Sequence, residues 1–385
     1  MKPLRIAVFT ETYLPALNGV AVSVHTFCRE LRALGHKVMV FAPSFPGRRM
    51  PSEEGIFRFP AILFPHVKFY PVPLPLRGGF WTRLRRFRPH IVHVHSIFTL
   101  STLGLLCGRR LKLPVVITYH TLLEDYAHYG RPLPEPLVRW FVRERTRKFC
   151  NQCDLVISPG RSIVPVLRSY GVRAPIVVVP TGVDIKPPKL TKEEARRVLG
   201  LPRGPLVLYV GRVAKEKNIP LLLRSFAEVA PKVPEAKLVV VGGGPLLPEA
   251  KRMALNLGVA KRTVFVGFVP RERVPLYYSA CDLFAFPSTT ETQGLSVLEA
   301  IAHGLPAVTV NVNGAGELIT QGVDGFVVPP RVGPFSNALL LLLQSESLRR
   351  KMGEAGRRKG KDFSSRRQAE RLAGIYQEVI SRHAR

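Results

Sequence analysis

Two glutamates, Glu291 and Glu299, flank the expected start of a helix in the segment FPSTTETQGLSVLEAIAHG. The backbone amides of Gln293, Gly294 and Leu295 would point from this helix end toward an anion, because the first turn of a helix has no internal acceptors for them. Each carboxylate can accept two hydrogen bonds and therefore suits a vicinal diol. The pattern indicates a sugar nucleotide, with phosphate at the helix end and sugars on both sides. The structural alternative makes Glu291 a helix-start residue and Glu299 a solvated helix charge.

A second group of polar residues follows another expected strand, in YVGRVAKEKN. Gly211 frees the backbone there, and the side chains of Arg212 and Lys217 could hold a diphosphate through charge-assisted hydrogen bonds. A solvated basic loop is the alternative for this segment taken alone.

Two glycine motifs lie at similar strand ends. The run at 242–244 in VVVGGGP would let a ligand approach the backbone closely, but the third glycine of a dinucleotide fingerprint would fall at Leu247. The interpretation of the chain as a dehydrogenase therefore lacks its main sequence motif. Asn18 and Gly19 lie between the first strand and the first helix, where a glycine lets backbone amides approach a phosphate. Turns also use this dipeptide routinely.

The segment TYHTLLEDYAHY contains residue types that bind metals, including His120, Glu124 and His128. His120 is expected to end the strand PVVITYH, whereas the other two lie beyond it at a spacing that brings them together without His120. We therefore expect no metal site. Cys150 and Cys153 form a single C-x-x-C without a second pair, which predicts ordinary reduced thiols.

The chain is strongly basic, with 57 Lys and Arg against 27 Asp and Glu and a net charge of +30. Nucleic acid, an anionic membrane and a polyphosphate ligand are possible partners, and compositional bias is the alternative. Residues 55–123 contain no acidic residue, and within them RGGFWTRLRRFRPH mixes arginines with aromatic residues, as suits a phospholipid surface. The expected acceptor or membrane contacts there are Arg77, Trp81, Arg83, Arg85 and Arg86.

Short apolar strands alternate with helices along the 385 residues, which predicts parallel sheets covered on both faces. A Pro- and Lys-rich stretch near Pro180–Thr191 interrupts this alternation. The prediction is an α/β chain with two doubly wound, Rossmann-like domains, 1–183 and 184–385, facing each other across a ligand-binding cleft, and the second ends in an amphipathic helix. No apolar run is long enough to cross a membrane and no leader-like segment opens the chain, so we expect a cytoplasmic protein or one on the inner face of the cell membrane.

These motifs together resemble the retaining glycosyltransferases of family 4, which have the GT-B fold. The resemblance rests on ETQGLSVLEA with its two glutamates, VGRVAKEKN, PTGVD and VVVGGGP in the second domain. LNGVAVSVHTFCREL and ITYHT carry it in the first domain.

The resemblance implies a role for each matching residue. The second domain would bind a nucleotide-sugar donor, with Arg212 and Lys217 on the diphosphate, Glu291 on the transferred sugar and Glu299 on the ribose. The amides of 293–295 would support sugar and phosphate. In the first domain, which would bind the acceptor, Gly19 would close on the diphosphate and His120 would lie at the transferred sugar.

TYHTLLEDYAHYG and the Asn18-Gly19 pair further resemble the branch of diacylglycerol 3-glucosyltransferases, which use UDP-glucose and make membrane glycolipids. The segment with Tyr126 would then line the acceptor side, and the protein would be peripheral on an anionic membrane. Mannosyl transfer to phosphatidylinositol, a sulfoquinovose donor and a polysaccharide acceptor are the alternatives within the family. A nucleic-acid-binding protein would leave Glu291 and Glu299 unexplained. A protein that binds a nucleotide sugar without turnover would not need all of the polar residues that this chain retains.

The expected chemistry needs no cofactor. Breaking a glycosyl–diphosphate bond leaves negative charge on the diphosphate, which Arg212, Lys217 and helix amides would stabilise. No D-x-D motif is present to hold a metal-bridged diphosphate. Retention suggests front-face attack, with a donor phosphate oxygen taking the acceptor proton, and Glu291 as a covalent nucleophile is the alternative.

Overall fold

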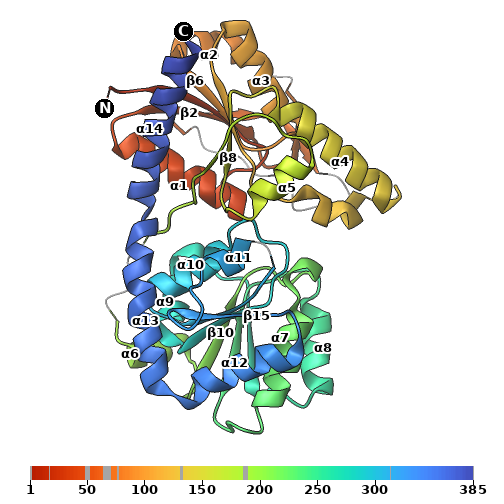
Figure 1. Cartoon of the computed structure of the whole chain (residues 1–385), viewed down its shortest axis with the longest axis vertical. Helices are drawn as coiled ribbons and strands as arrows, with labels where there is room; N and C mark the ends of the chain where they lie inside the picture. The colour runs from red at the N-terminus through yellow and green to blue at the C-terminus, as the bar shows by residue number, and fades with distance from the viewer. Residues whose placement is uncertain are drawn as a thin grey trace. The chain divides into compact units, whose positions relative to one another are not determined.

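The computed structural model describes residues 2–16, 18–47, 53–63, 71–75, 78–130, 133–184, 190–312 and 314–384. The chain forms two compact units: unit 1 comprises Met1–Gly182 and Ser365–Arg385, and unit 2 comprises Val183–Ser364. Each unit has its own parallel sheet with helices packed on it (Figure 1). The predicted α/β class with two doubly wound sheets is confirmed.

Unit 1 contains a seven-stranded sheet with the order β3-β2-β1-β6-β7-β8-β9, in which every neighbouring pair is parallel. Its strands are β1 Arg5–Phe9, β2 Lys37–Pro43, β3 Ile56–Phe59, β6 Ile91–Val94, β7 Val115–Thr118, β8 Leu155–Ser158 and β9 Ile176–Val178. An antiparallel pair is formed by β4 Ala61–Leu63 and β5 Pro71–Pro73. The strand order reverses between β1 and β6, and the carboxyl ends of strands near such a point are the usual ligand site.

Both faces of this sheet are covered, because alternate residues of each strand point in opposite directions. Ile6 and Val8 pack with α1 Gly19–Ala33 on one face. Ala7 and Phe9 pack on the other face, which is covered by α2 Phe80–Phe87, α3 Thr99–Leu111, α4 Glu135–Cys150 and α5 Ile163–Ser169. The 3-10 helix η1 Leu123–Gly130 precedes α4 and packs against it.

The last helix, α14 Ser365–His383, belongs to unit 1, whereas the sequence-based range 184–385 placed it in the second domain. Leu372 and Tyr376 of α14 are buried in the same cluster as α1 and the sheet, and α14 runs beside α1 (Figure 1, dark blue and red). The helix therefore covers unit 1, and the prediction was wrong on this point because an amphipathic pattern does not say which sheet receives the apolar face.

Unit 2 contains a six-stranded sheet with the order β12-β11-β10-β13-β14-β15, again with all neighbours parallel. Its strands are β10 Leu206–Val210, β11 Lys237–Val241, β12 Thr263–Gly267, β13 Leu283–Phe286, β14 Ala307–Val310 and β15 Gly325–Val328. The strand order reverses between β10 and β13, so the loops after these two strands are the expected ligand site.

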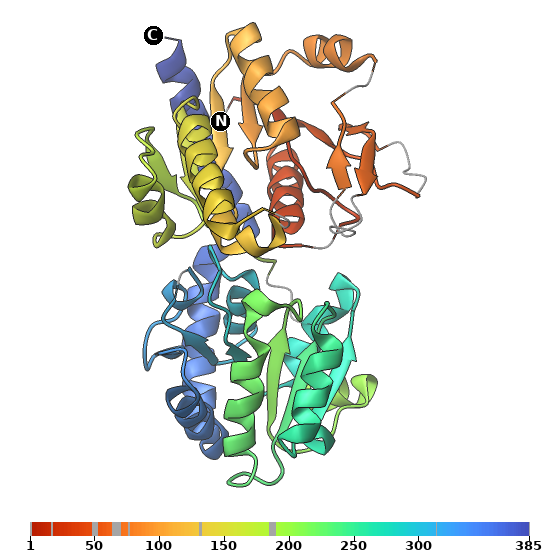
Figure 2. The same ribbon diagram turned by 90° about the vertical axis from the view of Figure 1, so that its right-hand side faces the viewer.

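Helices surround the unit 2 sheet, and Figure 2 shows two of them, α7 and α8, side by side in green. The helices are α6 Lys192–Leu199, α7 Ile219–Val229, α8 Leu247–Asn256, α9 Val274–Ala280, α10 Leu295–Ala302, α11 Gly314–Glu317, α12 Val332–Gln344 and α13 Glu346–Gly360. The short 3-10 helices are η2 Lys215–Lys217, η3 Ala260–Arg262, η4 Arg271–Arg273 and η5 Lys361–Phe363. Of the helices in the described part of the chain, none is long and apolar enough to cross a bilayer.

Candidate active site

An ion pair joins the two polar loops of unit 2. The Nζ of Lys217, in η2 after β10, donates to Oε1 of Glu291, in the loop after the neighbouring strand β13. The hydroxyl of Ser288 donates to the same carboxylate oxygen at 2.8 Å. Both ion-pair side chains are only 16% exposed. The structure therefore brings together two residues that the sequence analysis singled out in separate motifs, and it adds Ser288.

Arg212 lies beside a buried carboxylate that the sequence analysis missed. Glu216 is 6% exposed, and its Oε1 lies 4.0 Å from a guanidinium nitrogen of Arg212. The spacing of four residues was a signal that could have found this pair. Because burying an uncompensated carboxylate is costly, Glu216 stabilises a cation beside it and thereby favours the observed position of Arg212.

The glycine run after β11 supports the Arg212 loop. A Cβ on Gly242 would lie 1.9 Å from the carbonyl oxygen of Gly211, and one on Gly244 would lie 2.2 Å from that of Val213. Both glycines also have positive φ. Glycine at these two positions therefore allows the loop after β10 to pack closely against them. A Cβ on Gly243 would meet nothing nearer than 3.9 Å.

Glu299 of α10 is held in place by two partners rather than projecting into solvent. Its Oε1 accepts a hydrogen bond from Arg271 at 2.9 Å, and its Oε2 accepts one from the buried Tyr278 hydroxyl at 3.0 Å. The carboxylate is 15% exposed, so it is not the solvated helix charge of the structural alternative. Neither Arg271 nor Tyr278 could be assigned to Glu299 from spacing in the sequence.

The start of α10 agrees with the predicted helix start near Gly294. Gly294 has φ of +81° and immediately precedes Leu295, the first helical residue. The carbonyl of Glu291 accepts from the Gly314 amide at 2.7 Å, which ties this loop to α11. The amides of Gln293, Gly294 and Leu295 thus lie at a helix N-terminus in the loop that carries Glu291, an arrangement that favours an anion.

His120 of unit 1 follows β7 and contacts a second histidine. Its Nε2 lies 2.9 Å from Nδ1 of His95, which follows the adjacent strand β6. Burial lowers the pKa of His120 to about 3 and that of His95 well below its ordinary value. Both imidazoles are therefore neutral near pH 7. A neutral imidazole can hydrogen-bond to an uncharged group but cannot stabilise a negative charge as a cation would.

Gly19 is the first residue of α1, and a Cβ built on it meets nothing within 4 Å. The preceding Asn18 caps the helix, since its Oδ1 accepts from the Ala21 amide at 2.9 Å. Its Nδ2 donates to the hydroxyl of Thr12 at 2.9 Å and so fixes the loop after β1. Gly19 therefore lies at a capped helix start with open space around it.

His120 and Glu124 of the segment TYHTLLEDYAHY have different partners. Glu124 accepts a hydrogen bond from Arg143 of α4, whereas His120 contacts His95. The side chain of His128 lies outside the described residues. Within the described ranges, no three or more His, Cys, Asp or Glu side chains gather closely enough to hold a metal ion. Tyr126 lies in η1 and is partly buried.

The basic helix α2 differs from the expected membrane surface in one respect. Arg83, Arg85 and Arg86 are exposed, but Trp81 packs partly buried against the core, with the guanidiniums of Arg85 and Arg110 over its ring at 5.9 and 5.5 Å. Trp81 is therefore partly buried against the core of unit 1 rather than fully exposed. Arg77 lies outside the described residues.

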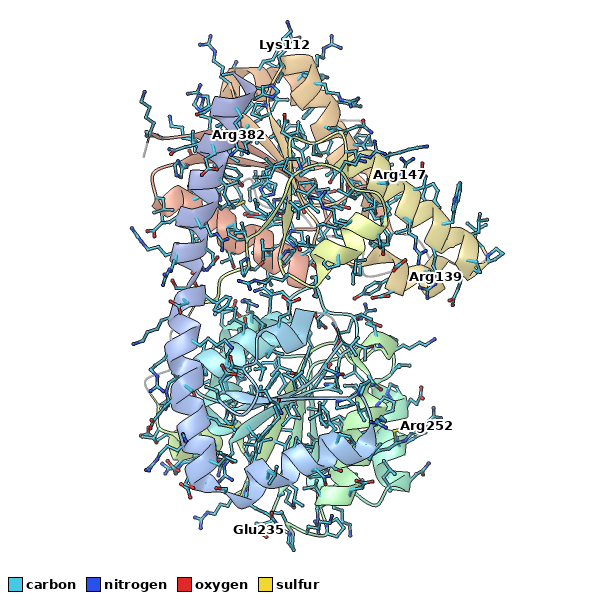
Figure 3. All side chains as sticks on the ribbon, viewed as in Figure 1. Lys112, Arg139, Arg147, Glu235, Arg252 and Arg382 are labelled. Carbon is cyan, nitrogen blue, oxygen red and sulfur yellow. The ribbon has the colours of Figure 1, made fainter. Side chains whose placement is uncertain are left out.

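Large exposed apolar side chains gather instead on α4 and just before it. Leu133, Leu137, Trp140 and Phe141 are 55%, 49%, 62% and 56% exposed. Figure 3 labels Arg139 near the outer end of α4 and Arg147 farther along this helix.

Comparison with known proteins assigns families to both halves of the chain. Residues 17–186 match the model described as Glycosyltransferase Family 4, and residues 191–359 match the one described as Glycosyl transferases group 1. The alpha-monoglucosyldiacylglycerol synthase of Streptococcus pneumoniae is 35% identical over 318 residues, covering 79% of this chain and 70% of that protein. A GDP-mannose-dependent alpha-mannosyltransferase of Corynebacterium glutamicum is 30% identical over 339 residues, covering 85% and 77%.

Solved structures agree on the fold. Anabaena HepE in complex with UDP superimposes with a TM-score of 0.77 at 18% identity, covering 97% of this chain and 100% of that one. At this identity the likeness supports the GT-B arrangement of secondary structure and nothing finer.

Proposed function

The chain belongs to glycosyltransferase family 4 and is a hexosyltransferase with a nucleotide-sugar donor, and we propose that it transfers glucose from UDP-glucose to 1,2-diacylglycerol with retention of configuration. The observation that carries the donor half of this proposal is the Lys217–Glu291 pair at the carboxyl ends of β10 and β13. The lipid half rests on the named activity of the 35% identical relative.

Unit 2 would hold the donor by charge and by diol recognition. Arg212 and Lys217 offer donors to the diphosphate, and the amides of 293–295 add the N-terminal end of α10. Glu291 would accept hydrogen bonds from hydroxyls of the transferred sugar, and Glu299 from the ribose. Tyr278 and Ser288 hold these carboxylates in position, so less ordering is required when the donor binds.

The transfer step separates charge, and the proposed roles follow from this. The bond from the anomeric carbon to the diphosphate oxygen breaks, the acceptor hydroxyl oxygen bonds to the same face of that carbon, and its proton passes to a phosphate oxygen. Arg212 and Lys217 would stabilise the departing diphosphate, while Glu291 would stabilise positive charge on the sugar. His120 of unit 1 would contact the transferred sugar as a neutral imidazole. No metal or other cofactor has a part in this scheme.

The substrate proposal is tested by product formation. Purified protein is incubated with UDP-glucose, UDP-galactose or GDP-mannose and with vesicles containing diacylglycerol or phosphatidylinositol. We expect a glucosylated diacylglycerol from UDP-glucose, with the α configuration visible by NMR. Mannolipid from GDP-mannose and phosphatidylinositol would contradict the proposal and favour the activity named for the mannosyltransferase relatives.

A diacylglycerol acceptor lies in a bilayer, so we further propose that the protein acts in the cytoplasm as a peripheral protein on the inner face of an anionic membrane. The surface that supports this comprises Leu133, Leu137, Trp140 and Phe141, here called the α4 apolar surface, together with the arginines of α2 and α4. Apolar side chains that enter the headgroup layer beside basic residues give binding that depends on anionic lipid. Tyr126 lies in η1, which packs against α4, and would line the acceptor side of this surface.

Replacing Trp140 and Phe141 together with serine should weaken binding to anionic vesicles by at least about tenfold, since burying one large apolar side chain contributes roughly 1.5–3 kcal/mol. Co-sedimentation with phosphatidylglycerol vesicles measures the effect. Leu255→Ser is the matched control, because Leu255 is a 69% exposed apolar residue on α8 of unit 2. Equal binding by wild type and double variant, or binding indifferent to salt and lipid charge, would contradict this docking surface.

A further inference from the structure

Three histidines lie together at the carboxyl ends of two neighbouring strands of unit 1. His93 is in β6 and His95 directly follows it, so the two side chains share one face of the sheet, and their ring centroids lie 4.0 Å apart. His120 follows β7, the next strand of the sheet. His93 and His95 are 1% and 4% exposed. Buried polar side chains require hydrogen-bond partners, and the partners of these two histidines differ.

His93 is bonded as a core residue. Its Nδ1 lies 2.6 Å from the hydroxyl of Tyr376 on α14, and its Nε2 lies 2.7 Å from the hydroxyl of Thr118. Both ring nitrogens are thus used within the interior of unit 1. His93 therefore links α14 to the sheet by a hydrogen bond. In the described structure it makes no hydrogen bond to His120.

His95 is hydrogen-bonded to His120. Its Nδ1 lies 2.9 Å from Nε2 of His120, and the two rings are nearly parallel, with an interplanar angle of 25° and centroids 5.2 Å apart. Burial lowers the pKa values of both residues, so both rings are neutral. A hydrogen bond between two neutral imidazoles needs one N–H donor and one bare nitrogen, so the tautomer of one ring determines that of the other.

We infer that His95 is a positioning residue that holds the ring of His120 in one orientation and one tautomer. This inference rests on the proposed function, in which His120 contacts the transferred sugar. Buried and packed beside His93, His95 supplies a rigid partner, and a fixed tautomer presents one defined donor or acceptor to the sugar. Outer partners that orient a functional histidine are commonly needed for full activity.

Asparagine and glutamine at position 95 separate this role from simple packing. The amide of asparagine occupies the position of the Nδ1 of histidine and can keep the bond to His120, whereas that of glutamine reaches the position of Nε2. Both are polar and of similar size, so His95→Asn and His95→Gln have comparable chances of folding. His93→Gln is a further control from β6, since its amide reaches the position of Nε2 and so loses the bond of Nδ1 to Tyr376 of α14, while the His95–His120 bond stays in place.

The readout is the imidazole 15N spectrum of histidine-labelled protein, with the His120 signals assigned by comparison with His120→Gln. We expect a single His120 tautomer in wild type, in His95→Asn and in His93→Gln, and a changed or mixed tautomer in His95→Gln. Turnover of UDP-glucose should fall on the order of 10–100-fold in His95→Gln with little change in donor KM. His93→Gln should instead lower the melting temperature, because it loses the bond to Tyr376.

A double variant keeps the two proposals separable. If His95 acts through His120, His95→Gln adds no further loss of kcat in a His120→Gln background. An unchanged His120 spectrum together with unchanged turnover in His95→Gln would overturn the inference and make His95 a core residue. Full activity of His120→Gln would overturn the proposed role of His120 itself, while the spectrum would still decide whether His95 sets its tautomer.

Discussion

Glu291→Gln is expected to lower kcat for hexose transfer on the order of 10²–10³-fold while leaving UDP bound at least as tightly as in wild type. The substitution keeps the shape of the side chain and removes its charge. A neutral amide cannot stabilise the positive charge that develops on the sugar as the diphosphate departs. UDP has no hexose, so it does not use the sugar contact that Glu291 would make.

The expected gain in UDP affinity has a separate cause. Lys217 is paired with Glu291, and the pair is mostly buried. Removing the carboxylate charge releases the ammonium to interact with the diphosphate, and it also removes a negative charge that would repel the ligand. Initial rates with UDP-glucose and calorimetric titration with UDP measure the two quantities separately.

Glu235→Gln is the matched control for this substitution. Glu235 is exposed and lies two residues before β11, at the amino-terminal edge of the unit 2 sheet. Figure 3 labels it at the end of the unit away from the polar loops. It should change neither rate nor affinity. Full turnover in Glu291→Gln would disprove a role for the charge, and a parallel loss of UDP binding would mean that the loop itself had collapsed.

The fold was largely predictable because the central strands of both sheets are buried at nearly every position. In β8 and β13 all residues are buried, so their sequences LVIS and LFAF are continuous apolar runs. Such runs between helices have one common solution, a parallel sheet covered on both faces. The placement of α14 was not predictable, because its amphipathic pattern does not name the sheet that it covers, and the structure shows this through its packing beside α1 and the contact between Tyr376 and His93.

The candidate site was predictable in its residue types but not in its pairing. The motifs around Arg212 and Glu291 identify residues that can hold phosphate and sugar, yet the bond between Lys217 and Glu291 joins residues distant in sequence. Glu216 was missed although it follows Arg212 by only four residues in the sequence. The partial burial of Trp81 was not predictable, because a basic and aromatic sequence does not show which ring packs against the core.

Lys217→Ala is expected to have the second large effect, and unlike Glu291→Gln it should impair both binding and turnover. Charge-assisted hydrogen bonds contribute about 1.5–3 kcal/mol, so UDP affinity should fall roughly 10–100-fold. Turnover should fall further, on the order of 10³-fold in kcat/KM, because the ammonium interacts more strongly with the diphosphate as it gains charge in the transition state.

The loss in Lys217→Ala has a second component that can be isolated. Without the ammonium, Glu291 keeps its charge and Ser288 as a partner but repels the incoming diphosphate. The double variant Lys217→Ala with Glu291→Gln should therefore bind UDP more tightly than Lys217→Ala alone, although it remains inactive. This non-additivity, measured by titration across the four proteins, gives the coupling between the two side chains.

Lys215→Ala is the control that nearly matches Lys217→Ala in position and charge. Lys215 lies in the same 3-10 helix η2 but is exposed. Removing a solvated lysine changes the net charge by the same amount, so a general electrostatic effect on UDP binding would appear equally in both variants. If the two variants lose the same affinity, Lys217 has no specific contact with the diphosphate. If only Lys217→Ala loses UDP affinity and the double variant regains part of it, Lys217 contacts the diphosphate specifically. The ammonium then has Glu291 as its partner in the free protein and the diphosphate as its partner when the donor is bound.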